Sequence, residues 1–347
     1  MGMWSKKPSI VVKLMVLMTI SVMVLAGCGT VKQKTTFEAN GAQQDKIKLT
    51  IADTISNPVF RVALNKGIFK KYGIEAEIVT FATPAEGVNA LFINQVNIAY
   101  GADFPILNAV SKGDYSIIAA TGTGLSDESA ANWKLFVRKE IQTPADLKGK
   151  TVSNFRGTFV SYLWDEYLQQ NQLELDDVKI VGQGGFDESY VALKSGEIDA
   201  VWVTGAVLIE KFESIEGVHI LTDMSQTLVR TGGDIVAPDS ILSEHPETIA
   251  NFIRALDEAA QFIKSNPDEV ADIMYKEVKQ PKEMTVKDLA FNNWTIEFSQ
   301  EAFDSLAKQK AYMLENGIIK DDFDLDSKID IAATKQVFPD RVTYKNQ

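Results

Sequence analysis

The fold is decided by one stretch of the chain, residues 47–101, which reads IKLTIADTISNPVFRVALNKGIFKKYGIEAEIVTFATPAEGVNALFINQVNIAYG. Short β-branched segments at 47–52, 76–81 and 96–101 predict strands, and the longer segments at 59–71 and 85–93 predict helices. Strands that alternate with helices in this way form βαβ units, which predict a parallel sheet. The sequence therefore predicts an α/β fold.

The N-terminal stretch has the features of an export signal. Three lysines, Lys6, Lys7 and Lys13, precede an apolar segment of about 13 residues, too short for a membrane-spanning helix of about 20. The segment ends in LAGC, and Cys28 is the only cysteine of the protein. This ending resembles the lipobox of bacterial lipoproteins. The resemblance implies removal of residues 1–27 and a lipid anchor on Cys28, with a cleaved signal and an incidental cysteine as the alternative.

The rest of the chain is acidic. The net charge is −12, and removal of the three lysines in the signal would make it more negative still. Such a body repels anionic lipid and nucleic acid, so we expect no nucleic-acid partner. Residues 28–45 are polar and lack apolar periodicity, which is typical of a flexible tether. About 300 residues then remain, enough for two lobes.

Two short apolar strands divide this body. LFV at 135–137 and IVA at 235–237 bracket a self-contained α/β block, so each is a candidate crossover between lobes. We expect the first lobe to comprise residues 46–135 and 235–347, and the second lobe to comprise residues 136–234. Pockets commonly form between domains, so the ligand cleft is expected between the lobes.

Four motifs suggest a family. They are ALNKGIFKKYGI at 63–74, TPADLKGKTV at 143–152, SGEIDA at 195–200 and HPE at 245–247. Nearly all of the chain beyond residue 28 resembles the periplasmic-binding-protein-like family that carries taurine, alkanesulfonates, nitrate and the pyrimidine precursor of thiamine. The resemblance implies a type II two-lobed fold and a transport role. Many members have an aromatic residue and a proline where this chain has Val203, Thr204 and Gly205, so its pocket is expected to differ.

Ligands of doubly wound sheets lie at the carboxyl ends of strands, and two loops there belong to the first lobe. The strand at 47–52 is followed by Asp53, Thr54 and Asn57, which supply polar groups beside a helix start. The strand at 96–101 is followed by Asp103 and Phe104, a carboxylate and an aromatic wall. We expect these residues to bind the ligand. In each loop, a plain helix cap is the alternative.

A third loop carries the strongest chemical signal. Arg156, Gly157, Thr158 and Phe159 follow the strand expected at about 152–155 and open a helix. Free amide groups at a helix start, with a hydroxyl and a guanidinium beside them, favour an anion such as a sulfonate, phosphate or carboxylate. The corresponding family loop contacts the ligand, which the resemblance transfers to residues 157–159. For Thr158, capping alone is the alternative, and for Arg156 simple solvation.

A fourth region pairs Thr204, at the end of a strand, with Arg230 and Thr231, just before the returning strand. Arg230 would neutralise a ligand charge or bridge the lobes, and an ordinary surface salt bridge is the alternative. Trp202 is expected in the core, because alternation places it opposite the faces of its neighbours.

Enzymatic chemistry finds little support. The two histidines, His219 and His245, lack the spacing of metal ligands, and no Gly-x-Ser-x-Gly motif occurs. The segment VGQGG at 181–185 lacks the lysine and hydroxyl residue of a phosphate loop. The fold family also includes enzymes that make the thiamine pyrimidine, but their cysteine-rich motif is absent from this sequence. We therefore expect no catalytic residues, no metal and no cofactor.

These features predict the solute-binding subunit of an ABC importer, outside the cytoplasm and anchored to the membrane through Cys28. The expected partners are a permease and its ATPase, and the subunit itself is expected to be a monomer. The ligand would close a hinge between the lobes. A small organic anion such as taurine or an alkanesulfonate is the leading candidate. A pyrimidine-type thiamine precursor, nitrate or bicarbonate are alternatives, as is an enzyme related to thiamine-pyrimidine synthesis, or a binding protein that signals without transport.

Overall fold

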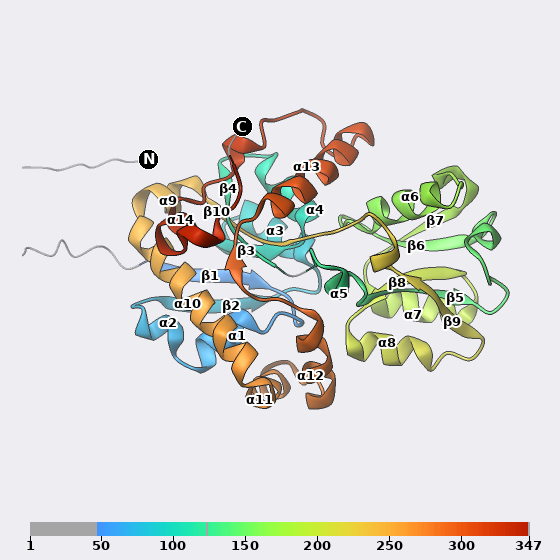
Figure 1. Ribbon diagram of the computed structural model, residues 1–347, viewed down its shortest axis with the longest axis horizontal. Helices are drawn as coiled ribbons and strands as arrows, with labels where there is room; N and C mark the ends of the chain where they lie inside the picture. The colour runs from blue at the N-terminus through green and yellow to red at the C-terminus, as the bar shows by residue number, and fades with distance from the viewer. Residues whose placement is uncertain (1–46, 123, 346–347) are drawn as a thin grey trace, which may run out of the picture. The chain divides into compact units, whose positions relative to one another are not determined.

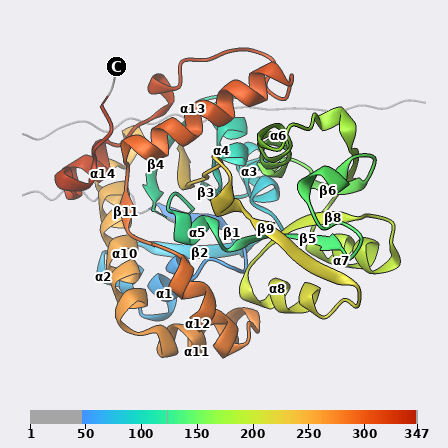
Figure 2. The same cartoon turned by 45° about the vertical axis from the view of Figure 1, so that its right-hand side comes forward.

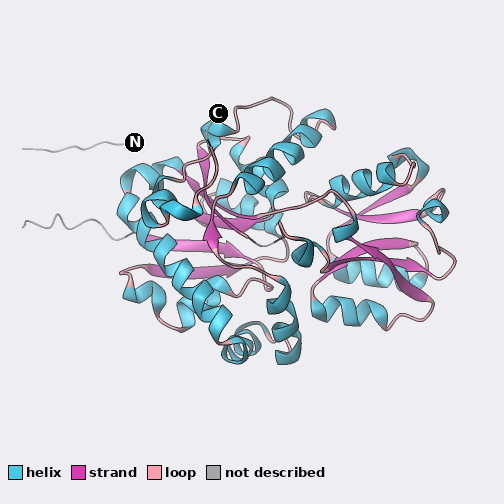
Figure 3. Ribbon diagram, viewed as in Figure 1, coloured by secondary structure: helices cyan, strands magenta, loops and turns pink. Residues whose placement is uncertain are grey.

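The computed structural model describes residues 47–122 and 124–345 (Figure 1). Its strands form two separate sheets, of six and five strands, and helices lie on the faces of both (Figure 3). The architecture is the expected α/β fold with two lobes. Cys28, the export signal and the tether lie outside the described residues. None of the helices within the described ranges is long and apolar enough to span a membrane.

The six-stranded sheet forms the first lobe, with the order β11-β4-β10-β3-β1-β2. Strands β1 and β2 are parallel, as are β1 and β3, whereas β10 lies antiparallel between β3 and β4. The prediction of parallel pairing is therefore confirmed for the first βαβ units, and β10, for which no orientation was predicted, is an antiparallel strand within the same sheet. The strands are β1 (Lys48–Asp53), β2 (Glu75–Thr80), β3 (Ile98–Gly101), β4 (Tyr115–Thr121), β10 (Gly233–Pro238) and β11 (Ile296–Glu297).

The five-stranded sheet forms the second lobe, with the order β7-β6-β8-β5-β9. Strand β6 is parallel to β7 and β8, and β5 is antiparallel to β8 and β9. The two candidate crossover segments thus belong to different sheets, 135–137 to β5 and 235–237 to β10. The strands are β5 (Trp133–Arg138), β6 (Thr151–Phe155), β7 (Lys179–Gln183), β8 (Ala200–Thr204) and β9 (Val218–Asp223).

Helices cover both faces of each sheet. The helix expected at 59–71 is split in two, because Gly67 adopts a left-handed conformation with φ of 68° between the two halves. The long helix α10 lies against the first half (Figure 1). The helices are α1 (Val59–Asn65), α2 (Ile68–Lys71), α3 (Pro84–Phe92), α4 (Asp103–Val110), α5 (Asp127–Ala130), α6 (Val160–Gln170), α7 (Phe186–Ser195), α8 (Ala206–Glu213), α9 (Asp239–Glu244), α10 (Pro246–Ser265), α11 (Pro267–Val278), α12 (Lys282–Phe291), α13 (Gln300–Glu315) and α14 (Ala332–Val337).

Successive residues of a strand point to opposite faces of the sheet, so neighbouring residues pack into two different hydrophobic clusters. In β10, Ile235 packs in the cluster that contains Phe60 of α1 and Phe252 of α10, and the adjacent Val236 packs in the other cluster, with Leu306 of α13. The first cluster is reinforced by stacking of Phe60 and Phe252, with ring centroids 6.2 Å apart. The central strands of the first sheet are therefore buried on both faces, which explains why β3, β4 and β10 read as almost continuous apolar segments, whereas the edge strand β2 is partly exposed.

The second sheet has its own aromatic core. Trp202 of β8 is fully buried, as the alternation predicted, and it meets Trp164 and Tyr167 of α6 edge to face. On the opposite face, Phe136 of β5 packs against Phe212 of α8. Helices α6 and α8 therefore clamp this sheet from its two sides.

Two chain segments connect the sheets, one between β4 and β5 and the other between β9 and β10, and they lie against each other. Gly124 has a φ of 85°, and a Cβ atom built on it would lie 2.0 Å from the carbonyl oxygen of Thr231. Only glycine fits this close approach of two backbones. Position 124 therefore fixes how the two connecting segments pass each other.

Candidate functional site

The loop after β1 is organised around an arginine that the sequence gave no reason to single out. Asp53, the last residue of β1, is buried and forms an ion pair with the guanidinium of Arg61, at 2.5 Å. Arg61 also donates to the carbonyl of Thr54 at 2.9 Å, and Asn57 accepts the amide of Val59 at 2.8 Å. Burial raises the pKa of Asp53 to about 7 in spite of the neighbouring guanidinium.

The loop after β3 forms a buried hydrogen-bond network. Asp103 accepts the backbone amide of Gly232 at 2.6 Å, and its other oxygen accepts the hydroxyl of Ser305 and, at 2.8 Å, the amide of Gln309. Gln309 also donates to the carbonyl of Arg230, which lies 2.8 Å from the Ser305 hydroxyl oxygen. Asp103 therefore ties β3 to α13 and to the segment that returns from the second lobe.

A second buried carboxyl group, Asp234, contacts Asp103. Neither side-chain oxygen of Asp234 has a hydrogen-bond partner within the described residues. Two buried carboxyl groups that lie this near each other are not both ionised, because like charges in a buried site repel strongly. Burial raises the pKa of both groups. Because Asp103 already accepts three other donors, we assign the proton to Asp234.

This buried acid group gives a pH dependence of stability. A raised pKa means that the folded chain binds the proton more tightly than the unfolded chain, so its stabilising effect is present at low pH and is lost as pH rises through the folded-state value. We expect the melting temperature to fall by several degrees between about pH 5 and about pH 8. Calorimetry across this range measures the effect.

The matched variant for this experiment is Asp234→Asn, because its side chain has a similar shape and stays neutral at every pH. The slope of melting temperature against pH should be clearly smaller in this variant. An identical slope in both proteins would remove Asp234 as its source.

The loop after β6 contains the residues to which an anion was assigned. Thr158 donates to the carbonyl of Phe155 at 2.9 Å, and its oxygen lies 3.4 Å from the amide of Val160, the first residue of α6. Arg156 is exposed and donates to the carbonyl of Gly182 at 2.6 Å. Gly157 has a φ of 73°, and a Cβ atom built on it would lie 3.4 Å from that of Ala85. This loop therefore touches the start of α3 in the first lobe.

Aromatic side chains gather beside this loop. Phe159 is buried and meets Trp133 edge to face, with centroids 5.0 Å apart. Phe186, at the start of α7, lies 6.3 Å from Trp133 and 4.6 Å from Phe155. Trp133 and Phe186 are partly exposed, and the sequence analysis singled out neither. An aromatic wall, made of rings tilted to one another, thus lies next to the start of α6.

The fourth region is divided between two places. Thr204 ends β8, whereas Thr231 lies in the returning segment, where its buried hydroxyl has no hydrogen-bond partner within the described residues. Arg230 donates to the carbonyls of Thr227 and Val229 and to the carboxylate of Asp127 in α5. Its guanidinium therefore joins the two connecting segments. Asp103, Arg230 and Thr231 are brought together by the fold, and Thr204 belongs to the other sheet.

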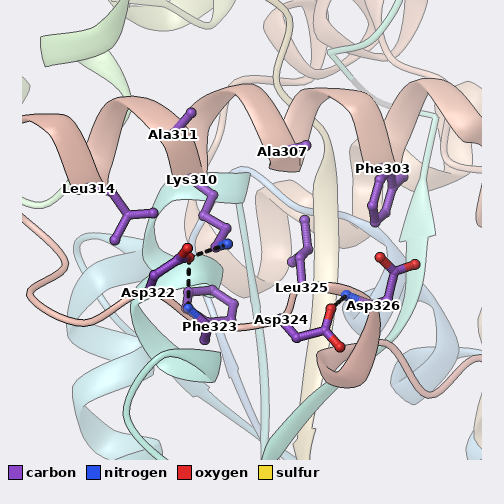
Figure 4. A pocket seen from close by; sticks show the side chains of 10 residues that line it. All are labelled: Phe303, Ala307, Lys310, Ala311, Leu314, Asp322, Phe323, Asp324, Leu325 and Asp326. Atoms are coloured by element: carbon purple, nitrogen blue, oxygen red, sulfur yellow. Dashed lines mark hydrogen bonds and ion pairs between the residues drawn. The ribbon is translucent and has the colours of Figure 1, made fainter. Parts of the chain in front are cut away.

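A surface hollow of about 690 Å³ lies elsewhere, beside α13 (Figure 4). Lys310 reaches across it to Asp322 at 2.6 Å, and Phe303 and Leu325 line it. It contains none of the residues expected to bind the ligand. Over the described ranges, no group of three or more histidine, cysteine, aspartate or glutamate side chains is arranged to hold a metal ion.

Comparison with known proteins assigns the family. The model of the family described as NMT1/THI5 like matches residues 58–270, which is more than half of the chain. The chain belongs to the NMT1/THI5-like family. Its fold also matches the periplasmic aliphatic sulphonate binding protein SsuA from Escherichia coli, with a TM-score of 0.70 and 19% identity over 81% of this chain and 97% of SsuA. The predicted family and the periplasmic-binding-protein-like fold are thereby confirmed.

Relatives of this NMT1/THI5-like protein include binding proteins. A putative binding protein of Brucella abortus is 27% identical over 67% of this chain and 71% of its own length. A putative aliphatic sulfonates-binding protein of Bacillus subtilis is 26% identical over 80% and 82%. A putative thiamine biosynthesis protein of Haemophilus influenzae is 25% identical over 62% and 68%. The fold also occurs in an enzyme, the desulfurization enzyme DSZB, with a TM-score of 0.62 and 14% identity over 85% of this chain and 99% of DSZB.

Proposed function

We propose that this protein is the solute-binding subunit of an ABC importer and that it captures a small organic anion, best a sulfonate. The observation that carries the proposal is the likeness to the Bacillus subtilis relative, which extends over 80% of this chain and therefore includes both lobes. The fold shared with SsuA is consistent with it. Taurine and alkanesulfonates are the leading candidates for the solute.

In this proposal, the anion binds at the start of α6. The backbone of Gly157 and Phe159 supplies amide groups where the helix dipole is positive, whereas the amide of Thr158 donates to the carbonyl of Phe155 at 3.3 Å, so that Thr158 would contribute its side chain. Arg156 spends one donor on Gly182, and its guanidinium has further donors for a sulfonate oxygen. In the first lobe, Thr54 is the partly exposed strand-end residue that would meet the solute, and the buried Asp53, Asn57, Asp103 and Phe104 would position the loops that face it. The remaining contacts would come from Thr204, Arg230 and Thr231.

A ring-shaped solute is the second candidate, and the aromatic wall favours it. Trp133 and Phe186 are partly exposed beside the same helix start, so that a flat heterocycle would stack there while its polar edge meets the amide groups. The relative from Haemophilus influenzae makes a thiamine-pyrimidine precursor the natural ring to test, in import or in an enzyme related to pyrimidine synthesis. Nitrate and bicarbonate would use the amide groups alone.

The proposed cycle begins outside the cytoplasm, where a lipid on Cys28 holds the protein, a monomer, at the membrane. The solute contacts both lobes and favours the closed arrangement through its additional contacts there. The closed form then docks on a permease, and the ATPase drives transport. The nearness of Gly157 to Ala85, where an added Cβ atom would come within 3.4 Å, supports a closure that brings the second lobe towards the start of α3.

The test is a thermal-shift screen of the purified full-length protein in mild detergent with taurine, alkanesulfonates, nitrate, bicarbonate and thiamine-pyrimidine precursors. A solute present at 100 times its Kd stabilises the folded state by about 2.7 kcal/mol, so we expect a sulfonate to raise the melting temperature by about 5 °C or more. Thr158→Ala should abolish that rise.

Thr343→Ala is the matched control, because Thr343 is an exposed threonine of the C-terminal segment and should leave the shift intact. A rise only with a heterocycle would replace the sulfonate and keep the import role. A sulfonate shift that survives in Thr158→Ala would move the site away from the α6 start.

A further inference from the structure

A carboxyl group of the first lobe reaches the start of a helix in the second lobe. Helix α12 lies beside α8 in both views (Figures 1 and 2). Asp288 of α12 accepts the backbone amide of Ala206, the first residue of α8, at 2.7 Å. Its other oxygen accepts the amide of Gln280 at 3.0 Å. The side chain of Asn132, just before β5, lowers the pKa of Asp288. The contact therefore spans two sheets.

The chain connectivity places the partners in different lobes. Helix α12 follows α11, which packs on α1, and it leads into β11 at the edge of the first sheet. Helix α8 follows directly from β8, in the middle of the second sheet. A second bond lies close by, in which the hydroxyl of Ser129 in α5 donates to the carbonyl of Phe291 at the end of α12. Asp288 is therefore the charged member of a small polar contact between lobes.

The carboxylate of Asp288 lies at the start of α8, a position that favours a negative charge. The first amide groups of a helix have no partner within the helix, and the helix dipole favours negative charge there. In α/β sheets this place, beyond the carboxyl end of a central strand, is where anionic ligands are held. Burial raises the pKa of Asp288, and Ala206, Gln280 and Asn132 oppose that rise. The chain thus places one of its own acids where an anionic ligand would fit.

We propose that Asp288 is a latch between the lobes, which caps α8 and holds the second lobe against α12. This inference goes beyond solute binding and does not depend on which solute is carried. It means that contacts made by the chain itself, in addition to those with a solute, favour the arrangement in which the lobes are together. Loss of the latch would increase the population of open arrangements.

Hydrogen–deuterium exchange of the full-length protein tests the latch at the atom concerned. In Asp288→Ala, the peptide that contains residues 205–208 should exchange at least about tenfold faster, as expected for a lost hydrogen bond to a charged acceptor. The peptide that covers β8 should be unchanged. The radius of gyration from small-angle scattering should also increase, because the lobes separate.

Glu283→Ala is the matched control, since Glu283 is an exposed acid on the same helix, and it should change neither measurement. Unchanged exchange at residues 205–208 in Asp288→Ala would overturn the proposal. So would faster exchange throughout the second sheet, or faster exchange at 205–208 with an unchanged radius, because these results describe general destabilisation or a simple helix cap.

If the alanine variant does not fold, Asp288→Asn provides the same test. It keeps the shape and one acceptor oxygen but removes the charge. Its exchange at 205–208 and its radius should change in the same directions by smaller amounts, and wild-type values for both would reject the latch.

Discussion

Asp103→Ala is expected to lower the melting temperature by about 10 °C. The side chain accepts the amide of Gly232, the hydroxyl of Ser305 and the amide of Gln309, all in the interior. Truncation leaves these donors without an acceptor, at a cost of about 1–3 kcal/mol for each that finds no water. A total of about 3–5 kcal/mol follows.

Differential scanning calorimetry measures this loss, and two further variants show its origin. Asp187→Ala removes an acid whose side chain is 92% exposed, in a surface ion pair with Lys211, and should cost less than about 1 kcal/mol. Asp103→Asn keeps the shape but turns one acceptor into a donor, so it should lie between the two. Equal melting temperatures for Asp103→Ala and Asp187→Ala would show that the network contributes nothing.

Arg61→Leu is expected to cost about 3–5 kcal/mol near neutral pH, the range for breaking a buried ion pair from one side. The substitution leaves Asp53 without its guanidinium, in a place where its side chain is fully shielded from solvent. The double variant Asp53→Asn/Arg61→Leu should recover part of the loss, because no buried charge remains. Chemical denaturation of the single and double variants measures both values.

The same variant has a distinct pH signature. Arg61 opposes the burial that raises the pKa of Asp53, so its removal raises that pKa further. A raised pKa stabilises the protonated folded state at low pH and loses that effect as pH rises. The deficit of Arg61→Leu relative to wild type should therefore be smaller at about pH 5 than at about pH 8. Lys148→Leu, at an exposed ion pair with Asp177, should show no such trend, and a pH-independent deficit in Arg61→Leu would contradict this account.

The sequence predicted the elements better than their orientation. The alternation of short and long segments located β1, α3 and β3 to within about two residues, because periodicity and turn residues are local signals. The apolar pattern of a short strand such as β5 or β10 is the same whether the strand pairs parallel or antiparallel. The pattern therefore did not reveal that both strands pair antiparallel. Glycine at position 67 was visible, but the break it makes between α1 and α2 depends on a conformation that spacing does not reveal.

For the candidate site as well, the sequence predicted the positions of residues but not their contacts. Asp53 and Asp103 were selected because they follow strands, and their burial confirms only that position. The groups that pair with Asp103 come from Ser305 and Gln309, about two hundred residues later on an amphipathic helix to which no chemistry was assigned. Asp288 was missed for the same reason. Contacts between distant segments are determined by the topology of the chain, which local patterns do not encode.

The position of β10 has a consequence for how the chain folds. This strand lies between β3 and β4 and supplies the hydrogen bonds that join them, yet it begins at Gly233, more than a hundred residues after β4 ends. During synthesis the five-stranded sheet is complete by Asp223, before the six-stranded sheet can close. The edges of β3 and β4 that pair with β10 therefore stay unpaired until β10 has been synthesised. Pairing across such a long stretch of sequence gives the sheet a high contact order, which slows folding and leaves unpaired strand edges exposed to aggregation. The second lobe is expected to fold first and to deliver β10 into this gap.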